Sequence, residues 1–149
     1  MIEVIYTQHL HIPAAAKILF ETYYGSLDCA KNYLKGKIKT KESLVALEGN
    51  KVVGVLIYAR DYSHYANYIQ DIAVSKQYRQ RGIAMLLMKK CIEISKRETP
   101  SKQKYLLSST DATNKPSIKF HLMCGFKEIG RLKWLHYGKD EVFFAYKLF

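Results

Sequence analysis

The chain has 149 residues, of which 48% are hydrophobic and 25% charged, a composition typical of one globular domain with a sizeable core. Its formal net charge of +11, from 24 Lys and Arg against 13 Asp and Glu, favours anionic partners such as nucleotide phosphates. The basic residues are dispersed rather than grouped in a block, so we expect no nucleic-acid partner.

Helical and strand-like segments alternate along the chain. Residues 1–7 alternate apolar and polar side chains, which indicates a first strand. Two helices are predicted next, over 14–23 and from about 26 to 37, the second capped by Ser26 or Asp28. Further strands are predicted over 43–47, 52–59, 68–74, 104–110, 126–134 and 141–148, and further helices from Gly82 onward and over 117–124.

Turn residues separate these elements. Residues 48–51, Glu-Gly-Asn-Lys, predict a hairpin turn, and residues 60–66 predict a polar, tyrosine-rich connection. Thr-Pro-Ser at 99–101 marks a break after the long helix. The predicted order is therefore β, α, α, β, β, β, α, β, α, β, β, without repeats or linkers, in a single domain over residues 1–149.

The most informative stretch is a strand, a basic loop and a helix in succession. The strand covers 68–74 and the helix begins at Gly82. The first amide groups of a helix have no acceptor within it, and their partial positive charge favours anions. Gly82 allows a ligand to approach the backbone, small Ala84 keeps the next turn open, and Arg79 and Arg81 add full charges. This arrangement predicts a phosphate or pyrophosphate site, and the alternative is an ordinary helix start with solvated arginines.

The run Arg79-Gln80-Arg81-Gly82-Ile83-Ala84 resembles the acyl-CoA signature of the GNAT superfamily of N-acetyltransferases. That signature is Gln or Arg, two residues, Gly, one residue, then Gly or Ala. Here it follows the strand Ile72-Ala73-Val74 and precedes an apolar helix, as in the family. The resemblance implies that this loop binds acetyl-CoA. It also implies that the backbone of Ile72 and Val74 pairs with the pantetheine arm, one amide polarising the thioester carbonyl.

The mixed order of elements also resembles the GNAT fold across essentially the whole chain. The resemblance implies a mixed α/β fold, with a mostly antiparallel sheet of six to seven strands and about four helices. In that fold the strands predicted over 68–74 and 104–110 lie parallel and splay apart, and the acyl-pantetheine arm lies in the gap. Ligands of parallel strands generally bind at their carboxyl ends, which is consistent with this location.

A second resemblance lies at residues 114–126, NKPSIKFHLMCGF. The family pattern contains Asn, a small residue, an aromatic residue, a tyrosine and Gly-Phe, and His121 here replaces the tyrosine that protonates the departing thiolate. Asn114 and His121 are seven residues apart, so we expect both on one side of the helix. A histidine could act as acid, base or hydrogen-bond donor, or it could only pack on the helix.

Asp71 precedes Ile-Ala-Val, as in several small-amine acetyltransferases that this stretch resembles. The resemblance implies that Asp71 lines the acceptor pocket, and the alternative is a strand residue paired with a surface Lys or Arg. The glutamate base of some family members would fall near Tyr68, which leaves the general base unassigned. The predicted catalytic residues are His121 and Asp71, and the predicted cofactor-binding residues are Ile72, Ala73, Val74, Arg79, Gln80, Arg81, Gly82, Ile83, Ala84, Asn114, Ser117 and Phe120.

Tyrosines concentrate around the first helices and the central strand. They could line an acceptor pocket, although packing in the core or on the surface is the favoured role for each one singly. The group comprises Tyr23, Tyr24, Tyr33, Tyr62, Tyr65 and Tyr68, together with His64.

The sequence lacks the signatures of several other functional classes. Three well-separated cysteines without a CxxC pair indicate neither a disulfide framework nor a zinc site. His9, His11 and His136 lack metal-ligand spacing, so we expect no metal. There is also no Walker loop, nucleophile elbow or dinucleotide fingerprint. No apolar run has membrane-spanning length and no secretory signal is visible, so we expect a cytoplasmic protein without a membrane partner.

We interpret the chain as an acyltransferase, in which an amine attacks the thioester of acetyl-CoA without a covalent enzyme intermediate. The acceptor, a small molecule or a peptide amine, stays open because variable loops build such pockets. A homodimer through the final strands is possible. The alternatives are a non-catalytic CoA-binding or regulatory module on the same fold, suggested by His121, and a basic nucleic-acid-binding domain, which the dispersed lysines support only weakly.

Overall fold

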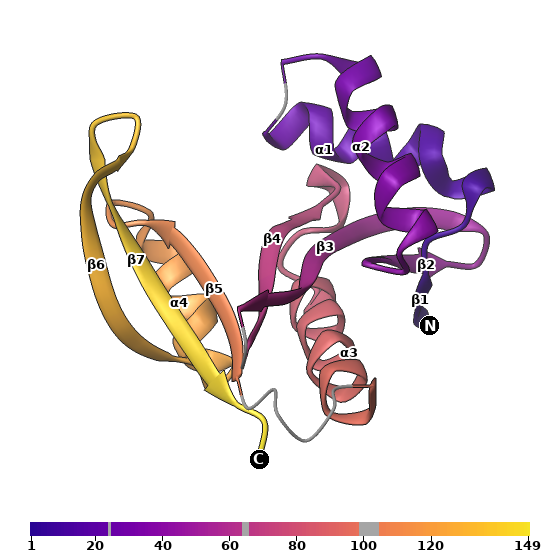
Figure 1. The fold of residues 1–149 in the computed structure, drawn as a ribbon. Coiled ribbons are helices and arrows are strands. Elements are labelled where there is room, and N and C mark those ends of the chain that lie inside the picture. Colours follow the sequence, from indigo (N-terminus) through magenta and orange to yellow (C-terminus); the bar gives the residue numbers. More distant parts are fainter. Residues whose placement is uncertain (24, 64–65, 99–104) are drawn as a thin grey trace. The chain divides into compact units, whose positions relative to one another are not determined.

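The fold is taken from a computed structural model, which describes residues 1–23, 25–63, 66–98 and 105–149 (Figure 1). The chain divides into two compact units. The first unit comprises Met1–Tyr58 and Asp71–Cys91, and the second comprises Ala59–Gln70 and Ile92–Phe149. Among the described residues, no helix combines the length and apolar character needed to cross a membrane.

The elements follow the predicted order, with two additional short 3-10 helices. They are β1 (Ile2–Tyr6), η1 (His9–His11), α1 (Ile12–Thr22), α2 (Leu27–Lys39), β2 (Ser43–Glu48), β3 (Lys51–Ser63), β4 (Ala66–Val74), η2 (Lys76–Tyr78), α3 (Ile83–Glu98), β5 (Tyr105–Asp111), α4 (Lys115–Met123), β6 (Lys127–His136) and β7 (Lys139–Lys147).

The seven strands form one mixed sheet in the order β1-β2-β3-β4-β5-β7-β6. β1 pairs with β2, β2 with β3, and β7 with both β5 and β6, all antiparallel. β4 and β5 pair parallel, from Ala66 opposite Tyr105 to Tyr68 opposite Leu107. The predicted mixed, mostly antiparallel sheet with four helices and a central parallel pair is therefore confirmed.

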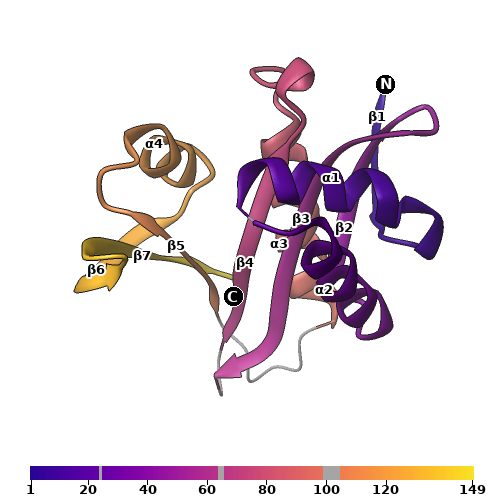
Figure 2. The same ribbon diagram turned by 90° about the horizontal axis from the view of Figure 1, so that it is seen from above.

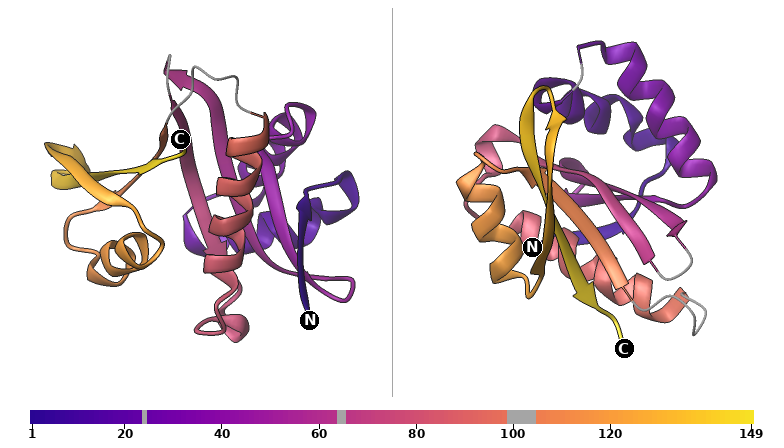
Figure 3. Two further views of the ribbon diagram at one scale, coloured as in Figure 1. Left: turned by 90° about the horizontal axis from the view of Figure 1, so that it is seen from below. Right: turned by 60° about the vertical axis from the view of Figure 1, so that its left-hand side comes forward.

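In the first unit, α1 and α2 cover one face of the strands and the beginning of α3 covers the other (Figures 2 and 3). Ala15, Leu19 and Leu34 of the two helices form a buried cluster with Val45 and Val55 of the strands. This packing explains the apolar residues at helical spacing in α1 and the nearly continuous apolar run of β2.

Gly54 of β3 brings α3 close to the other face of these strands. A Cβ atom at this position would lie 3.1 Å from both Ile83 Cγ2 and Leu87 Cδ1. Since real Cβ atoms rarely approach neighbours so closely, any other residue would require these two side chains to shift by a few tenths of an ångström. The start of α3, where the anion site is predicted, is thereby packed directly against β3.

In the second unit, α4 packs against the strands β5 and β7 (Figure 3). β5 pairs with β7 over its full length, from Tyr105 opposite Lys147 to Asp111 opposite Glu141. The ring of Phe144 in β7 is buried. It stacks on His121 of α4 with ring centroids 4.6 Å apart.

The predicted connection over residues 60–66 is wrong for its first part, because β3 continues to Ser63. Tyrosine favours strands, and the Tyr62 ring stacks on Tyr68 of β4 with centroids 4.8 Å apart. The amide of Asp61 also donates to Asn67 Oδ1 at 3.2 Å. Cross-strand partners therefore extend β3 beyond the end that its polar composition predicts.

Candidate functional site

The predicted anion site lies in the first unit, where β4 ends and α3 begins. The carbonyl of Gly82 accepts the first helical hydrogen bond, from the amide of Leu86 at 3.1 Å. The amides of Ile83 and Ala84 thus belong to the first turn, whose N–H groups have no acceptor within the helix. Gly82 has φ +76° and Gln80 φ +62°, a left-handed conformation that favours glycine at position 82. A Cβ at Gly82 would meet no atom within 4 Å, so the space beside this backbone is open.

Three cations gather around this loop. The Cζ atom of Arg81 and the Nζ atom of Lys51 each lie 5.0 Å from the centre of the Tyr78 ring. Arg79 is exposed, and its Nε donates to the carbonyl of Val74 at 3.2 Å. Among the described residues, none of these three cations has a carboxylate partner. The loop therefore carries an unneutralised positive charge, which favours a polyanion.

Lys51 was not predicted as part of this site. It begins β3, and the amide of Ser75 after β4 donates to the carbonyl of Val53 in β3 at 2.9 Å. Strand pairing thus brings a residue about 30 positions earlier in the sequence next to the basic loop. A sequence signal for it exists: β3 and β4 follow each other in the chain, so the first residue of β3 is expected beside the last residues of β4.

Side chains at the end of α1 and in α2 interact with residues near the end of β4. The hydroxyl of Tyr23 donates to the carbonyl of Ile72 at 2.8 Å. Burial of this hydroxyl and the nearby Asp71 carboxylate raise the pKa of Tyr23 to about 12, although its side chain as a whole is 54% exposed. Burial lowers the pKa of Lys37, an effect that Glu42 and Asp71 oppose. Asp71 thus lies in the electrostatic neighbourhood of a phenol and an ammonium group, in the first unit.

His121 lies in the second unit, where it is buried with 2% of its surface exposed. Its Nδ1 lies 2.7 Å from the carbonyl of Ser117 and its Nε2 lies 2.7 Å from Ser108 Oγ. Since a carbonyl only accepts, Nδ1 carries the proton, and in the neutral ring Nε2 accepts from the Ser108 hydroxyl. Burial lowers the pKa of His121, which favours this neutral form. Both nitrogens are engaged, so a proton-transfer role would require one hydrogen bond to break.

The other predicted α4 residues have clear local roles. Asn114 is the N-cap, and its Oδ1 accepts from the amide of Ser117 at 3.2 Å. Phe120 is half-buried and lies edge-on to His121, with ring centroids 5.7 Å apart. These contacts position the helix, and the predicted cofactor contacts of Asn114, Ser117 and Phe120 stay predictions.

The described members of the predicted tyrosine group belong to both units, and their role in an acceptor pocket stays a prediction. Tyr23 reaches Ile72, whereas the Tyr33 ring lies 5.8 Å from Lys37 Nζ on α2. Tyr68 stacks with Tyr62 and its hydroxyl is hydrogen-bonded to Ser109 Oγ. Tyr24, His64 and Tyr65 lie outside the described residues.

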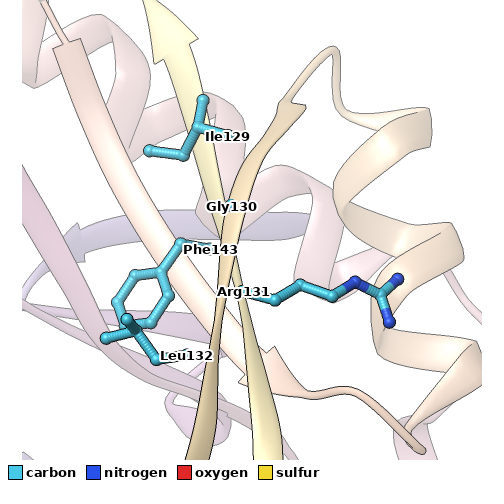
Figure 4. Close-up of a pocket in the computed structure, with 5 residues that line it drawn as sticks. All are labelled: Ile129, Gly130, Arg131, Leu132 and Phe143. Carbon is cyan, nitrogen blue, oxygen red and sulfur yellow. The ribbon is translucent and has the colours of Figure 1, made fainter.

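A hollow of about 270 Å³ lies on the β6–β7 hairpin of the second unit (Figure 4). It is lined by Ile129, Gly130, Arg131, Leu132 and Phe143. Leu132 and Phe143 lie together on one side of the hairpin, and Arg131 extends to the other. None of the predicted site residues lines this hollow.

Comparison with known proteins identifies the family. Residues 12–126 match the model of the acetyltransferase (GNAT) family. This chain belongs to the GNAT family. No curated protein sequence is significantly similar to it.

Solved structures of GNAT acetyltransferases have the same fold. A GNAT acetyltransferase from Bacillus cereus is 24% identical, with a TM-score of 0.83 over 99% of this chain and 97% of its own. The ribosomal-protein-S18-alanine N-acetyltransferase of Escherichia coli is 17% identical, with a TM-score of 0.80 over 99% and 94% of the two chains. YncA of Salmonella typhimurium, solved with its cofactor acetyl-CoA, is 14% identical, with a TM-score of 0.79 over 99% and 94%.

Proposed function

We propose that this GNAT protein is an N-acetyltransferase that binds acetyl-CoA at the β4–α3 loop and transfers the acetyl group to an amine. The observation that carries the proposal is the loop itself. Gly82, in a left-handed conformation, leaves the backbone at the helix start open to a ligand. Lys51, Arg79 and Arg81 lie around it, and none of them has a carboxylate partner within the described part of the chain. Such a site fits the phosphate groups of coenzyme A. Residues 1–149 would form a single acetyltransferase domain.

Different residues of the first unit would bind the phosphate groups and the pantetheine arm of the cofactor. The first-turn amides of α3, with Arg79 and Arg81, would hold the phosphates, and the backbone of Ile72 and Val74 would hold the pantetheine arm as an added strand. Bound acetyl-CoA would supply an acyl thioester that an amine attacks. Asp71 would bind the ammonium form of the acceptor and take up its proton.

The acceptor is proposed only as an amine, either of a small molecule or of a peptide. The Escherichia coli neighbour acts, by its name, on an alanine of a ribosomal protein, and a peptide N-terminus therefore belongs in the test. The carboxylate of Asp71 suits a cationic acceptor that is not polycationic, because the chain itself is strongly basic.

We propose that His121 has a structural role, supported by its burial and its two hydrogen bonds. This engagement also keeps one alternative function open, a CoA-binding module without turnover. Turnover of acetyl-CoA with any amine of a panel would exclude that alternative. Cofactor binding without turnover on the whole panel would support it.

A homodimer is also proposed, through β6, which is the last strand of the sheet order. Its exposed apolar side chains would be covered by a second copy of the chain. They are Ile129, Leu132, Trp134 and Leu135, with Tyr137 in the adjoining turn.

The first test is a thermal-shift titration with acetyl-CoA, CoA and ATP. A ligand at about a hundred times its dissociation constant stabilises a fold by roughly 2.7 kcal/mol, a shift of several degrees. Saturable stabilisation by acetyl-CoA well beyond that by ATP is expected, and Arg79→Glu with Gly82→Asp should abolish it in a folded protein. Retained binding by this double variant would refute the loop assignment. No shift of the unaltered protein at millimolar acetyl-CoA would refute the cofactor.

A further inference from the structure

The end of β4 has two backbone carbonyls on one edge. Ile72 and Val74 are two residues apart, so their carbonyls point to the same side of the strand. The amide of Ser75, one residue further, donates to Val53 of β3 at 2.9 Å, and the carbonyl of Ala73 lies near Gly54 of β3. Ser75 and Ala73 therefore face β3, and Ile72 and Val74 face the opposite edge.

Donors from the chain itself occupy both of these carbonyls. The Tyr23 hydroxyl donates to Ile72 at 2.8 Å, and Arg79 Nε donates to Val74 at 3.2 Å. Arg79 belongs to the adjoining loop, but Tyr23 lies 49 residues before Ile72, at the end of α1. A side chain that already donates to an edge carbonyl competes with the amide of an extended ligand for the same acceptor and for the space beside it.

Tyr23 lies just after the last residue of α1 and is partly exposed. Its backbone caps α1 outside helical geometry, with φ −131° and ψ −29°, and its amide remains bonded to Leu19 at 2.7 Å. The residue is 54% exposed, so part of it already lies in solvent. A change at its side-chain dihedrals would release Ile72 without disturbing the helix.

We propose that Tyr23 is a latch that closes the Ile72 edge of β4 and is displaced when the acyl-pantetheine arm of the cofactor pairs with this edge. The inference rests on the proposed function for the identity of the ligand. Only protein with the latch open would bind the arm in this way, so the measured dissociation constant is the intrinsic one divided by the open fraction. One hydrogen bond of ordinary net strength corresponds to about a two- to tenfold reduction in affinity.

Ionisation does not open the latch under ordinary conditions. Burial and Asp71 raise the pKa of Tyr23 to about 12, an effect that Arg79 opposes, so the hydroxyl remains a donor from pH 6 to 9. Lys37 also lies in the electrostatic neighbourhood of Asp71. We therefore expect the effect of removing the hydroxyl to be independent of pH in this range.

The test is calorimetric titration of acetyl-CoA into the unaltered protein and into Tyr23→Phe, which keeps the ring and removes the donor. Tyr23→Phe is expected to bind about two- to tenfold more tightly. Tyr105→Phe is the matched control, because Tyr105 is 38% exposed at the start of β5 and belongs to none of the proposed sites, and the affinity of this variant should not change. Tyr23→Leu, which removes ring and hydroxyl, should bind at least as tightly as the unaltered protein if Tyr23 only obstructs.

The outcomes separate the latch from the proposed function. Binding by the unaltered protein with an unchanged affinity in Tyr23→Phe would refute the latch and leave the cofactor site intact. Weaker binding by Tyr23→Phe would also refute it and would show that the hydroxyl contacts the ligand. Absence of binding by both proteins would refute the cofactor site, and the latch with it. Binding by Tyr23→Phe alone would support both.

Discussion

Replacing His121 by alanine should destabilise the fold. The substitution removes two hydrogen bonds of 2.7 Å, to Ser108 and Ser117, and a ring stacked on Phe144 at 4.6 Å. Two hydrogen bonds contribute about 1–3 kcal/mol and an aromatic pair about 0.5–1.5 kcal/mol. We therefore expect a loss of about 3 kcal/mol in the free energy of unfolding, or about 6–12 °C in melting temperature for a chain of this size.

The assay is thermal unfolding followed by circular dichroism, with Leu122→Ala as the control. Leu122 neighbours His121 on α4 but is 53% exposed, so its truncation should change the stability by less than about 0.5 kcal/mol. Ser108→Ala should give an intermediate loss that is not additive with His121→Ala, because both remove the same hydrogen bond. A His121→Ala protein that melts like the unaltered one but has lost turnover would refute the structural role and restore the catalytic prediction.

Three further predictions concern pH, packing and assembly. Burial lowers the pKa of His121, so on acidification the unfolded chain binds a proton at this histidine before the folded chain does. The free energy of unfolding should therefore be unaffected by this group above about pH 6.5 and fall below that pH, and His121→Phe should lessen the fall in acid unfolding curves. Gly54→Val should lower the free energy of unfolding by about 1–3 kcal/mol in urea titrations, because the new Cβ would lie 3.1 Å from side chains of α3. Gly36→Ala in α2 should raise it by about 0.5–1 kcal/mol, because the new Cβ would meet no atom within 4 Å and alanine favours a helix more than glycine does. Leu132→Lys with Leu135→Lys should convert a dimer to a monomer in light scattering, and a dimer that survives would exclude β6 as its interface.

The order of elements could be predicted because it depends on local patterns. The helices α1 and α3 show apolar residues at helical spacing, and turn residues mark the ends of most strands. The end of β3 could not be predicted, since residues up to Ser63 remain in the strand through contacts such as that of Tyr62 with Tyr68. Such cross-strand contacts depend on pairing, which a single segment does not reveal.

The same distinction holds for the site. The loop from Arg79 to Gly82 could be predicted because its residues are contiguous and its chemistry is that of a helix start. Lys51 could not, because strand pairing brings it to this loop from a distant position. Tyr23 was predicted only as one of several tyrosines that could line an acceptor pocket, and its contact with Ile72 depends on the packing of α1. His121 was predicted with two alternative roles, and its partners Ser108 and Phe144, on two other strands, are what favour packing.

Under the proposed function, the end of β4 would bind two parts of a ligand in different ways. Phosphate groups would need only the first-turn amides of α3 and the cations near Tyr78, so ATP should bind at that part alone. An acyl-pantetheine arm would use in addition the edge carbonyl of Ile72, to which Tyr23 donates. Tyr23→Phe should therefore raise the affinity for acetyl-CoA while leaving that for ATP unchanged. An equal gain for both ligands would mean that the hydroxyl acts on the phosphate region through charge, rather than on the edge of the strand.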